Sequence, residues 1–317
     1  MAERPTGGAR KPGAPHGDGQ AAGDRSRPPR PRSLHRYGQN HLVDGNILRA
    51  IVKQAAVGPD DVVLEVGAAD GQLTRPLLER ALLVHAFEID HRYASRLAKL
   101  ADEHPNLAVH PGDALKQDLA TLDPPPTALV ANLAYNVAIP LIMTTIAGLP
   151  QLSRWAVMVQ KELGERLFAE PSTKAYSAVS VLTQLACRQM EVRAVPPAAF
   201  RPQPRVDSSF ITFVRRAPAA AGTTTAAGDA PLTAAGYAAM DQLVRRAFGQ
   251  RRKVLTNTLA GAARAGVTLS RDDVRRALDD LGLSPAPRPE ELAPPQWVAL
   301  AQALGWPTGA VESHGHA

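Results

Sequence analysis

The chain has 317 residues, of which 44% are hydrophobic and 21% are charged, enough apolar material for a main domain and a smaller one. No stretch approaches the roughly 20 unbroken apolar residues that a membrane-spanning helix needs, so we expect no membrane partner. The single cysteine, Cys187, excludes an intrachain disulfide, and its apolar neighbours at 179–186 predict that it lies in a buried helix.

The positive charge is concentrated at the N-terminus. The chain carries a net charge of +6, and residues 1–32 hold seven basic and three acidic side chains, a net +4 that leaves +2 for the remaining residues. Because residues 1–32 contain no Val, Ile, Leu or Phe, they can neither fold alone nor act as a signal peptide. We predict a disordered basic tail over 1–33, with an RNA-contacting arm as the alternative, and a cytoplasmic location.

From residue 42 to 216 the pattern alternates helices with short buried strands. The predicted helices are 47–55, 73–80, 93–102 and 162–169, and the predicted strands are 62–66, 83–89, 107–110, 128–131 and 155–160. This alternation predicts an α/β domain over 34–216, with a mostly parallel sheet covered by helices on both faces. Such sheets bind ligands at the carboxyl ends of their strands.

A second region follows a linker. Residues 217–231 consist mainly of Ala, Gly, Thr and Pro without periodicity, which predicts a flexible linker. The helical patterns beyond it are 237–248, 252–263, 271–281 and 295–304. They predict a small all-helical domain over 232–306, followed by a disordered tail over 307–317.

Three features at predicted strand ends indicate a nucleoside site. Gly67 lies between a strand and a helix, where glycine lets a ligand approach the backbone, although Ala69 replaces the middle glycine of G-x-G-x-x-G. Glu88 is placed to accept hydrogen bonds from ribose hydroxyls, and Asp113 suits an adenine amino group. These features fit a dehydrogenase and a methyltransferase equally well. The histidines lack metal-ligand spacing, so we expect no metal.

The fourth strand ends in Asn132-Leu133-Ala134-Tyr135, which separates the two alternatives. The lone pair of adenine N6 is delocalised into the ring, so this nitrogen is a poor nucleophile. The Asn132 side-chain oxygen and the Leu133 carbonyl can accept both N6 hydrogens and favour a more tetrahedral nitrogen. Tyr135 can stack on the base and hold it in line with a sulfonium methyl. The tetrapeptide therefore indicates methylation of adenine N6.

At this point the sequence resembles a known family, the small-subunit (16S) ribosomal RNA adenine N6-dimethyltransferases, whose Asn-Leu-Pro-Tyr-Asn motif residues 132–136 nearly match. The resemblance spans residues 36–306 and includes further segments in the family's order. These segments are 37–42, 158–162, 174–177, 200–209 and 248–253. The resemblance implies a Rossmann-like methyltransferase fold with a small C-terminal helical domain, and an enzyme that uses S-adenosylmethionine.

The resemblance also implies roles for individual residues. The implied cofactor-binding residues are Asn40, Leu42, Gly67, Glu88, Asp113 and Asn132. Phe200 is the implied second aromatic side chain that sandwiches the target base, opposite Tyr135. Family members transfer two methyl groups to each of two adjacent adenines in a hairpin loop near the 3′ end of the rRNA. The implied partner is therefore the immature small ribosomal subunit, and we expect a monomeric enzyme.

Two groups of basic residues are candidates for phosphate binding. Arg201 and Arg205 lie near the proposed target pocket, and Arg251, Arg252 and Lys253 match the family at the start of a predicted helix. The same hypothesis includes Arg215, Arg216, Arg245 and Arg246.

Two positions depart from the family pattern and keep alternatives open. Ala69 adds a methyl group where backbone normally approaches the cofactor, and Ala134 replaces a proline that fixes φ at about −65°. These departures motivate a ribosome assembly factor that binds rRNA with little catalysis. The other alternative is the family that methylates an adenine of large-subunit rRNA and confers antibiotic resistance. Residues 174–176 and 250–253 favour the small-subunit family.

Overall fold

The computed structural model describes residues 40–216, 232–264 and 266–308. The predicted N-terminal tail, the predicted linker and most of the predicted C-terminal tail lie outside these residues. Within the described part of the chain, no helix is long and apolar enough to cross a membrane.

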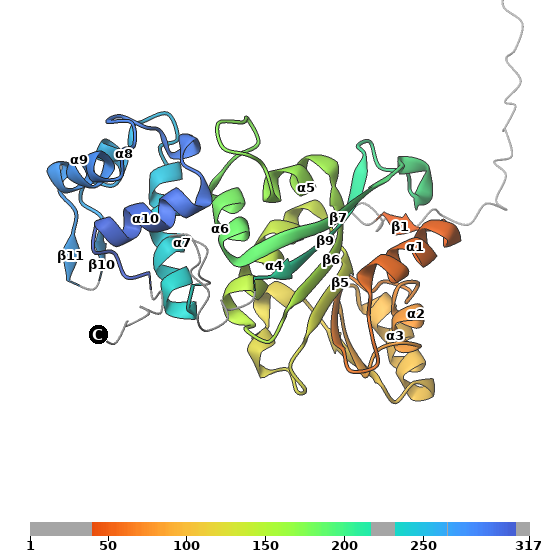
Figure 1. The fold of residues 1–317 in the computed structure, drawn as a ribbon. Helices are drawn as coiled ribbons and strands as arrows, with labels where there is room; N and C mark the ends of the chain where they lie inside the picture. Colours follow the sequence, from red (N-terminus) through yellow and green to blue (C-terminus); the bar gives the residue numbers. More distant parts are fainter. Residues whose placement is uncertain (1–39, 217–231, 265, 309–317) are drawn as a thin grey trace, which may run out of the picture.

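A seven-stranded sheet forms the centre of the molecule (Figure 1). The strand order is β4-β3-β2-β5-β6-β9-β7, and the bounds are β2 Val62–Val66, β3 Leu83–Glu88, β4 Leu107–Pro111, β5 Ala128–Asn132, β6 Arg154–Gln160, β7 Cys187–Val195 and β9 Ser208–Arg215. The first five strands in this order are parallel, and β9 pairs antiparallel with both of its neighbours. The predicted mostly parallel sheet is confirmed.

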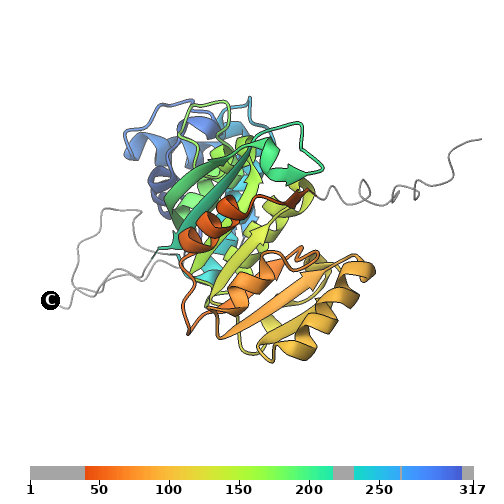
Figure 2. The ribbon, with the colours of Figure 1, turned by 90° about the vertical axis from the view of Figure 1, so that its right-hand side faces the viewer.

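Helices cover both faces of the sheet because alternate side chains of each strand point to opposite faces. In β5, Leu129 enters one apolar cluster and the next residue, Val130, enters the other. On the face of Val130, the cluster includes the helices α1 Gly45–Ala55, α2 Thr74–Leu78 and α3 His91–Glu103. On the face of Leu129, it includes α4 Tyr135–Gly148, α5 Lys161–Leu167 and α6 Ala178–Ala186. Figure 2 shows α1 crossing its face of the sheet.

The C-terminal region packs against α4 and α6 (Figure 1). It contains the helices α7 Ala234–Phe248, α8 Leu255–Thr258, α9 Arg271–Asp280 and α10 Pro294–Ala303, and the short strands β10 Ala263–Arg264 and β11 Val267–Thr268. The region is therefore mostly helical rather than all-helical. Its buried Leu243 and Trp297 belong to the same apolar cluster as Leu141 of α4, so the core continues from the sheet into this region.

Two sequence-based predictions are wrong in detail. The predicted helix 252–263 is only the short α8, because Val254 is extended (φ −70°, ψ 152°) and Gly261 has φ +73°. Cys187 does not lie in a helix: α6 ends at Ala186, and Cys187 is extended (φ −134°, ψ 160°) and begins β7. It is nevertheless fully buried, as a small core residue should be.

Candidate active site

A cavity of about 640 Å³ opens at the carboxyl ends of the parallel strands, where a sheet of this type binds ligands. It brings together most of the residues that the sequence nominated. The nominated residues that line it are Asn40, Gly67, Glu88, Asp113, Asn132, Leu133, Tyr135 and Phe200. Leu42 instead lines a neighbouring cavity of about 40 Å³.

The turn after β2 has a backbone conformation that favours glycine. Gly67 has φ +80°, and its N–H donates to the carbonyl of Phe87 at 2.9 Å. A Cβ atom at Gly67 would lie 3.7 Å from the carbonyl oxygen of Asn132, so a side chain would enter the space between β2 and β5. Ala69 also has positive φ, at 51°, which for alanine costs roughly 1 kcal/mol. The turn thus leaves space beside its backbone, which fits a nucleoside cofactor.

Glu88 ties this turn to β3. It is 1% exposed, and its two carboxylate oxygens accept hydrogen bonds from the N–H groups of Ala69 and Asp90, each at 2.8 Å. Burial raises the pKa of Glu88, and the two backbone N–H groups oppose this shift. Each oxygen retains a second lone pair, so Glu88 can also accept hydrogen bonds from ribose hydroxyls.

Asp113 begins a short helical turn after β4. Its side chain accepts a hydrogen bond from the N–H of Leu115 at 3.1 Å and borders the cavity. Two exposed apolar side chains, Ile89 and Leu115, line the same cavity. They can pack against a planar base, and the sequence analysis did not identify them. Ile89 could have been found from the sequence, because it is an apolar residue directly after Glu88, the acid at the end of a predicted strand.

Glu65 is a third residue near the site that sequence reasoning missed. It is 1% exposed, its Oε2 atom has no hydrogen-bond partner in the described part of the chain, and it borders the smaller cavity. Burial raises its pKa to about 8, assisted by the negative charge of Glu88 and opposed by the hydroxyl of Thr74. The available signal was an acid inside the otherwise apolar strand 62–66. This unpartnered oxygen also fits a polar ligand beside the glycine turn.

Asn132 ends β5 with a fixed side-chain orientation. Its Nδ2 atom donates to the backbone carbonyl of Asn40 at 3.0 Å, and a carbonyl can only accept. This contact leaves the Oδ1 atom of Asn132 as an acceptor for a ligand in the cavity. The next residue, Leu133, donates its N–H to the carbonyl of Met158 at 3.0 Å, which anchors the following turn to β6.

The two aromatic residues lie in the same cavity but are presented differently. Tyr135 is 59% exposed at the start of α4, whereas Phe200 is 1% exposed and belongs to the apolar cluster around α1. Phe200 is held in β8 Phe200–Arg201, which pairs with β1 His41–Leu42. Tyr135 therefore offers a free ring face, and Phe200 forms part of the wall.

Ala134 already has the conformation of the proline that it replaces. Its φ is −64° and its ψ is 147°, and it precedes the first helical residue of α4. We expect Ala134→Pro to raise the free energy of unfolding by about 0.5 kcal/mol and to leave methyl transfer equal or higher. Thermal melting and a methyl-transfer assay measure both effects.

A matched control is Ala138→Pro, four residues further along α4. Ala138 donates its N–H to the carbonyl of Ala134 at 3.0 Å, so proline there removes a helix hydrogen bond and is expected to cost about 3 kcal/mol. If Ala134→Pro loses most of its activity while its melting temperature stays the same, the turn does not accept proline in the conformation that methyl transfer needs.

The nominated basic residues fall into two groups. Arg201, Arg205, Arg252 and Lys253 are exposed. By contrast, Arg251 forms an ion pair with Glu290 and donates to the carbonyls of Thr173 and Lys174 at 3.0 and 3.1 Å. The segment 250–253 is a turn after α7 and not a helix. Arg251 is thus occupied by intramolecular contacts.

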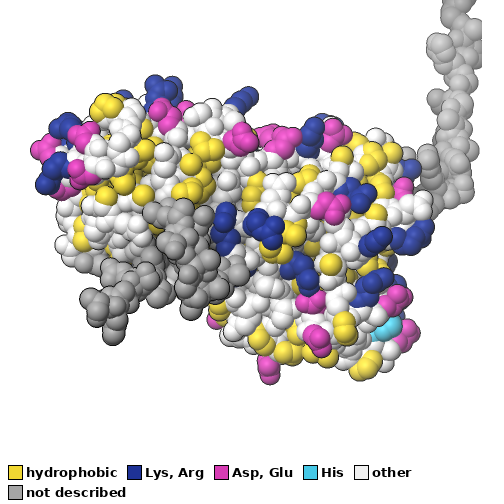
Figure 3. All heavy atoms as spheres, in the orientation of Figure 1, with side chains coloured by type: hydrophobic (Ala, Val, Ile, Leu, Met, Phe, Trp, Pro, Cys, Tyr) yellow, Lys and Arg dark blue, Asp and Glu magenta, His cyan; other side chains and the backbone are white. Residues whose placement is uncertain are grey.

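Several other arginines of the phosphate hypothesis also bind backbone carbonyls. Arg215 donates to Ile146, Leu149 and Leu152, Arg216 donates to Gln184, and Arg246 donates to Thr258 and Ala260. These contacts stabilise helix ends and loops. On the face drawn in Figure 3, Lys and Arg side chains gather over the sheet and α1, whereas basic and acidic side chains are mixed around α9.

Comparison with known proteins identifies the family. A profile described as ribosomal RNA adenine dimethylase matches residues 32–275, more than half of the chain. This chain belongs to that family. A protein of Rubrobacter xylanophilus named Ribosomal RNA small subunit methyltransferase A is 40% identical over 270 residues, which are 85% of this chain and 94% of the relative. One of Kineococcus radiotolerans with the same name is 40% identical over 288 residues, 88% and 90% of the two chains.

Solved structures agree with this assignment. A dimethyladenosine transferase from Plasmodium falciparum has a TM-score of 0.66 and 25% identity. The match covers 84% of this chain and 98% of the Plasmodium chain. The 23S rRNA methyltransferase ErmE has a TM-score of 0.61 and 26% identity, over 84% and 100%. The dimethylase is an S-adenosylmethionine-dependent methyltransferase with a Rossmann-like fold, and the predictions of fold, enzyme class and cofactor are confirmed. In the described residues, no group of three or more His, Cys, Asp or Glu side chains is placed to hold a metal ion.

Proposed function

We propose that this dimethylase transfers methyl groups to N6 of two adjacent adenines in the 3′-terminal hairpin loop of small-subunit rRNA during ribosome biogenesis. The observation that carries the proposal is the orientation of Asn132, whose Nδ2 atom is engaged by Asn40 and whose Oδ1 atom remains an acceptor at the cavity. An acceptor at this position can bind an exocyclic amino group of a base and cannot bind a carbonyl edge.

The reaction follows from what the surrounding side chains can do. The cofactor supplies an electrophilic methyl group on a sulfonium. Glu88, Asp113 and the Gly67 turn would bind its nucleoside part, which leaves Asn132 between the cofactor and the target base. The Asn132 Oδ1 atom and the Leu133 carbonyl would accept the N6 hydrogens, while Tyr135 stacks on the ring. The second transfer to each adenine has one N6 hydrogen fewer to bind.

The small subunit is the better supported target. The relatives named for the small subunit are 35–40% identical over at least 84% of the chain, against 26% for ErmE. The proline-like backbone of Ala134 also removes one of the two reasons to prefer a binding factor with little catalysis. We also propose that the enzyme acts as a monomer. We place the reaction in the cytoplasm, where bacterial ribosomal subunits assemble.

The test is incubation of the purified chain and S-adenosylmethionine with immature small subunits that lack this modification. Mass analysis of the digested rRNA should find N6-dimethyladenine at two adjacent positions of the 3′-terminal hairpin. Large-subunit rRNA in a parallel reaction should stay unmodified. Modification of the large-subunit RNA alone would support the resistance-type alternative, and binding to subunits without methylation would support the assembly factor.

Arg252 and Lys253 are the exposed basic residues of the turn after α7, and we propose that they contact phosphates. The double alanine variant is expected to bind small subunits about ten-fold more weakly. A plot of log affinity against log salt concentration falls with salt, and its slope should become shallower by about 2. Arg275→Ala with Arg276→Ala is a matched control, because it removes the same charge from α9, where both arginines pair with nearby aspartates. An unchanged salt slope in the Arg252 and Lys253 variant would exclude phosphate contact.

A further inference from the structure

The short strand β1 crosses the edge of the cofactor cavity. Its first residue, His41, borders both the main cavity and the smaller one beside Glu65. The side chain of Asn132 donates to the carbonyl of Asn40, directly before β1. The second residue of β1, Leu42, pairs with Phe200 of β8. The strand β1 therefore joins the cofactor side of the cavity to the side that would hold the target base.

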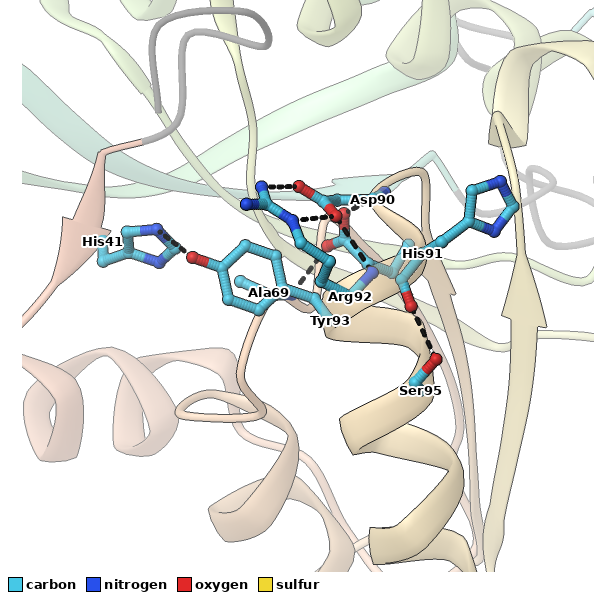
Figure 4. Close-up of polar contacts among 8 residues, drawn as sticks. His41, Ala69, Asp90, His91, Arg92, Tyr93 and Ser95 are labelled. Carbon is cyan, nitrogen blue, oxygen red and sulfur yellow. Dashed lines mark hydrogen bonds and ion pairs between the residues drawn. The ribbon is translucent and has the colours of Figure 1, made fainter. Parts of the chain in front are cut away.

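A third contact links β1 to α3 (Figure 4). The hydroxyl of Tyr93 lies 3.2 Å from Nε2 of His41, and the two ring centroids are 5.5 Å apart. Burial raises the pKa of Tyr93, so its hydroxyl keeps its proton at neutral pH and can donate to Nε2. In the other ring tautomer of His41, Nε2 donates to the Tyr93 oxygen, so either tautomer makes this contact.

Several contacts hold the part of α3 that contains Tyr93. The guanidinium of Arg96 lies over its ring, 5.4 Å from the centroid. The helix begins after Asp90, whose side chain accepts a hydrogen bond from the N–H of Arg92 at 3.0 Å. The N–H of Asp90 in turn donates to Glu88. The start of α3, Glu88 and the cofactor turn are thus one hydrogen-bonded unit, and Tyr93 extends this unit to β1.

We propose that His41 and Tyr93 are positioning residues for methyl transfer. Their hydrogen bond holds β1 at the edge of the cofactor cavity, where His41 borders the space that the cofactor would occupy. Neither side chain needs to touch the reacting atoms. The proposal rests on the function proposed above, since it assigns to this pair the positioning of that function's cofactor.

The test is a double-mutant cycle on cofactor binding in the full chain. Tyr93→Phe keeps the ring and removes the hydroxyl, and it should raise the Kd for S-adenosylhomocysteine about five-fold. The KM for S-adenosylmethionine should rise by the same factor, with kcat for small subunits changed by less than about two-fold. His41→Phe should have a similar effect, and the double variant should be no weaker than the weaker single variant.

Two further variants distinguish positioning from general stability. His41→Gln retains an acceptor for the Tyr93 hydroxyl and should keep the Kd within about two-fold of the wild type. Ser95→Ala removes a hydroxyl of the same helix, one that donates to the carbonyl of His91 and not to β1, and should leave the Kd unchanged. Wild-type affinity in Tyr93→Phe, or additive losses in the double variant, would overturn the proposal. Failure of the wild type to bind S-adenosylhomocysteine would overturn the proposed function as well.

Discussion

Asn132→Ala is expected to lower kcat for methyl transfer on the order of 10²-fold, the usual effect of removing one oriented hydrogen-bonding group from a reacting centre. Alanine removes the Oδ1 acceptor for adenine N6 and also the donor to Asn40, which holds the segment before β1. Single-turnover kinetics with saturating cofactor measure the loss directly. The KM for S-adenosylmethionine should change much less than kcat, because Glu88 and Asp113 lie elsewhere in the cavity.

Asn132→Asp separates the two functions of the side chain. It keeps an oxygen toward the base and replaces the donor to Asn40 by a second acceptor. If the acceptor matters most, the aspartate variant should be roughly ten-fold more active than the alanine variant. Equal activity of the two variants would show that Asn132 acts mainly by holding Asn40.

Glu65 makes the stability of the protein depend on pH. Its pKa is about 8 in the folded protein against an ordinary value of 4.5, so between these values the folded chain holds a proton that the unfolded chain has lost. A rise in pH over this range therefore favours unfolding. We expect the free energy of unfolding to fall by about 3 kcal/mol from this group alone between pH 5 and pH 8. Denaturant titrations at several pH values measure the slope.

Glu65→Gln removes this titration and keeps a similar shape. The variant should lose most of the decline between pH 5 and pH 8 and should exceed the wild type in stability at pH 8. Glu79→Gln is a matched control, because Glu79 is exposed at the end of α2, and it should retain the wild-type slope. A Glu65→Gln variant with the wild-type slope would show that this carboxyl group does not titrate in the range.

The parallel half of the fold could be predicted because its strands are short apolar runs between clear turns. Helix α4 was missed since it is apolar on nearly all sides and contains Pro140, which resembles a helix break. It lies between the sheet and the C-terminal helices and therefore has no polar face to produce a helical period. Strand β7 was missed because most of its residues are exposed and a bulge at 189–191 interrupts its alternation.

The position of a candidate site residue could be predicted wherever that residue lies at the end of its own strand. Gly67, Glu88, Asp113 and Asn132 follow this rule, and the structure brings them to one cavity. The contacts of Arg251 could not be predicted, because its partner Glu290 lies 39 residues away and the Thr173 carbonyl 78 residues away. A basic cluster in the sequence does not reveal which of its members are already paired in the fold.

The core that continues from the sheet into the C-terminal helices limits how the protein can recognise RNA. Tyr176, fully buried between the two regions, donates its hydroxyl to the carbonyl of Leu292 at 2.7 Å, close to the contacts of Arg251. Arg252 and Lys253, both exposed, therefore lie at a fixed distance from the cavity at the carboxyl ends of the strands. If these two residues contact phosphates as proposed, an RNA must present its target adenines and its phosphates at this distance to bind both places at once.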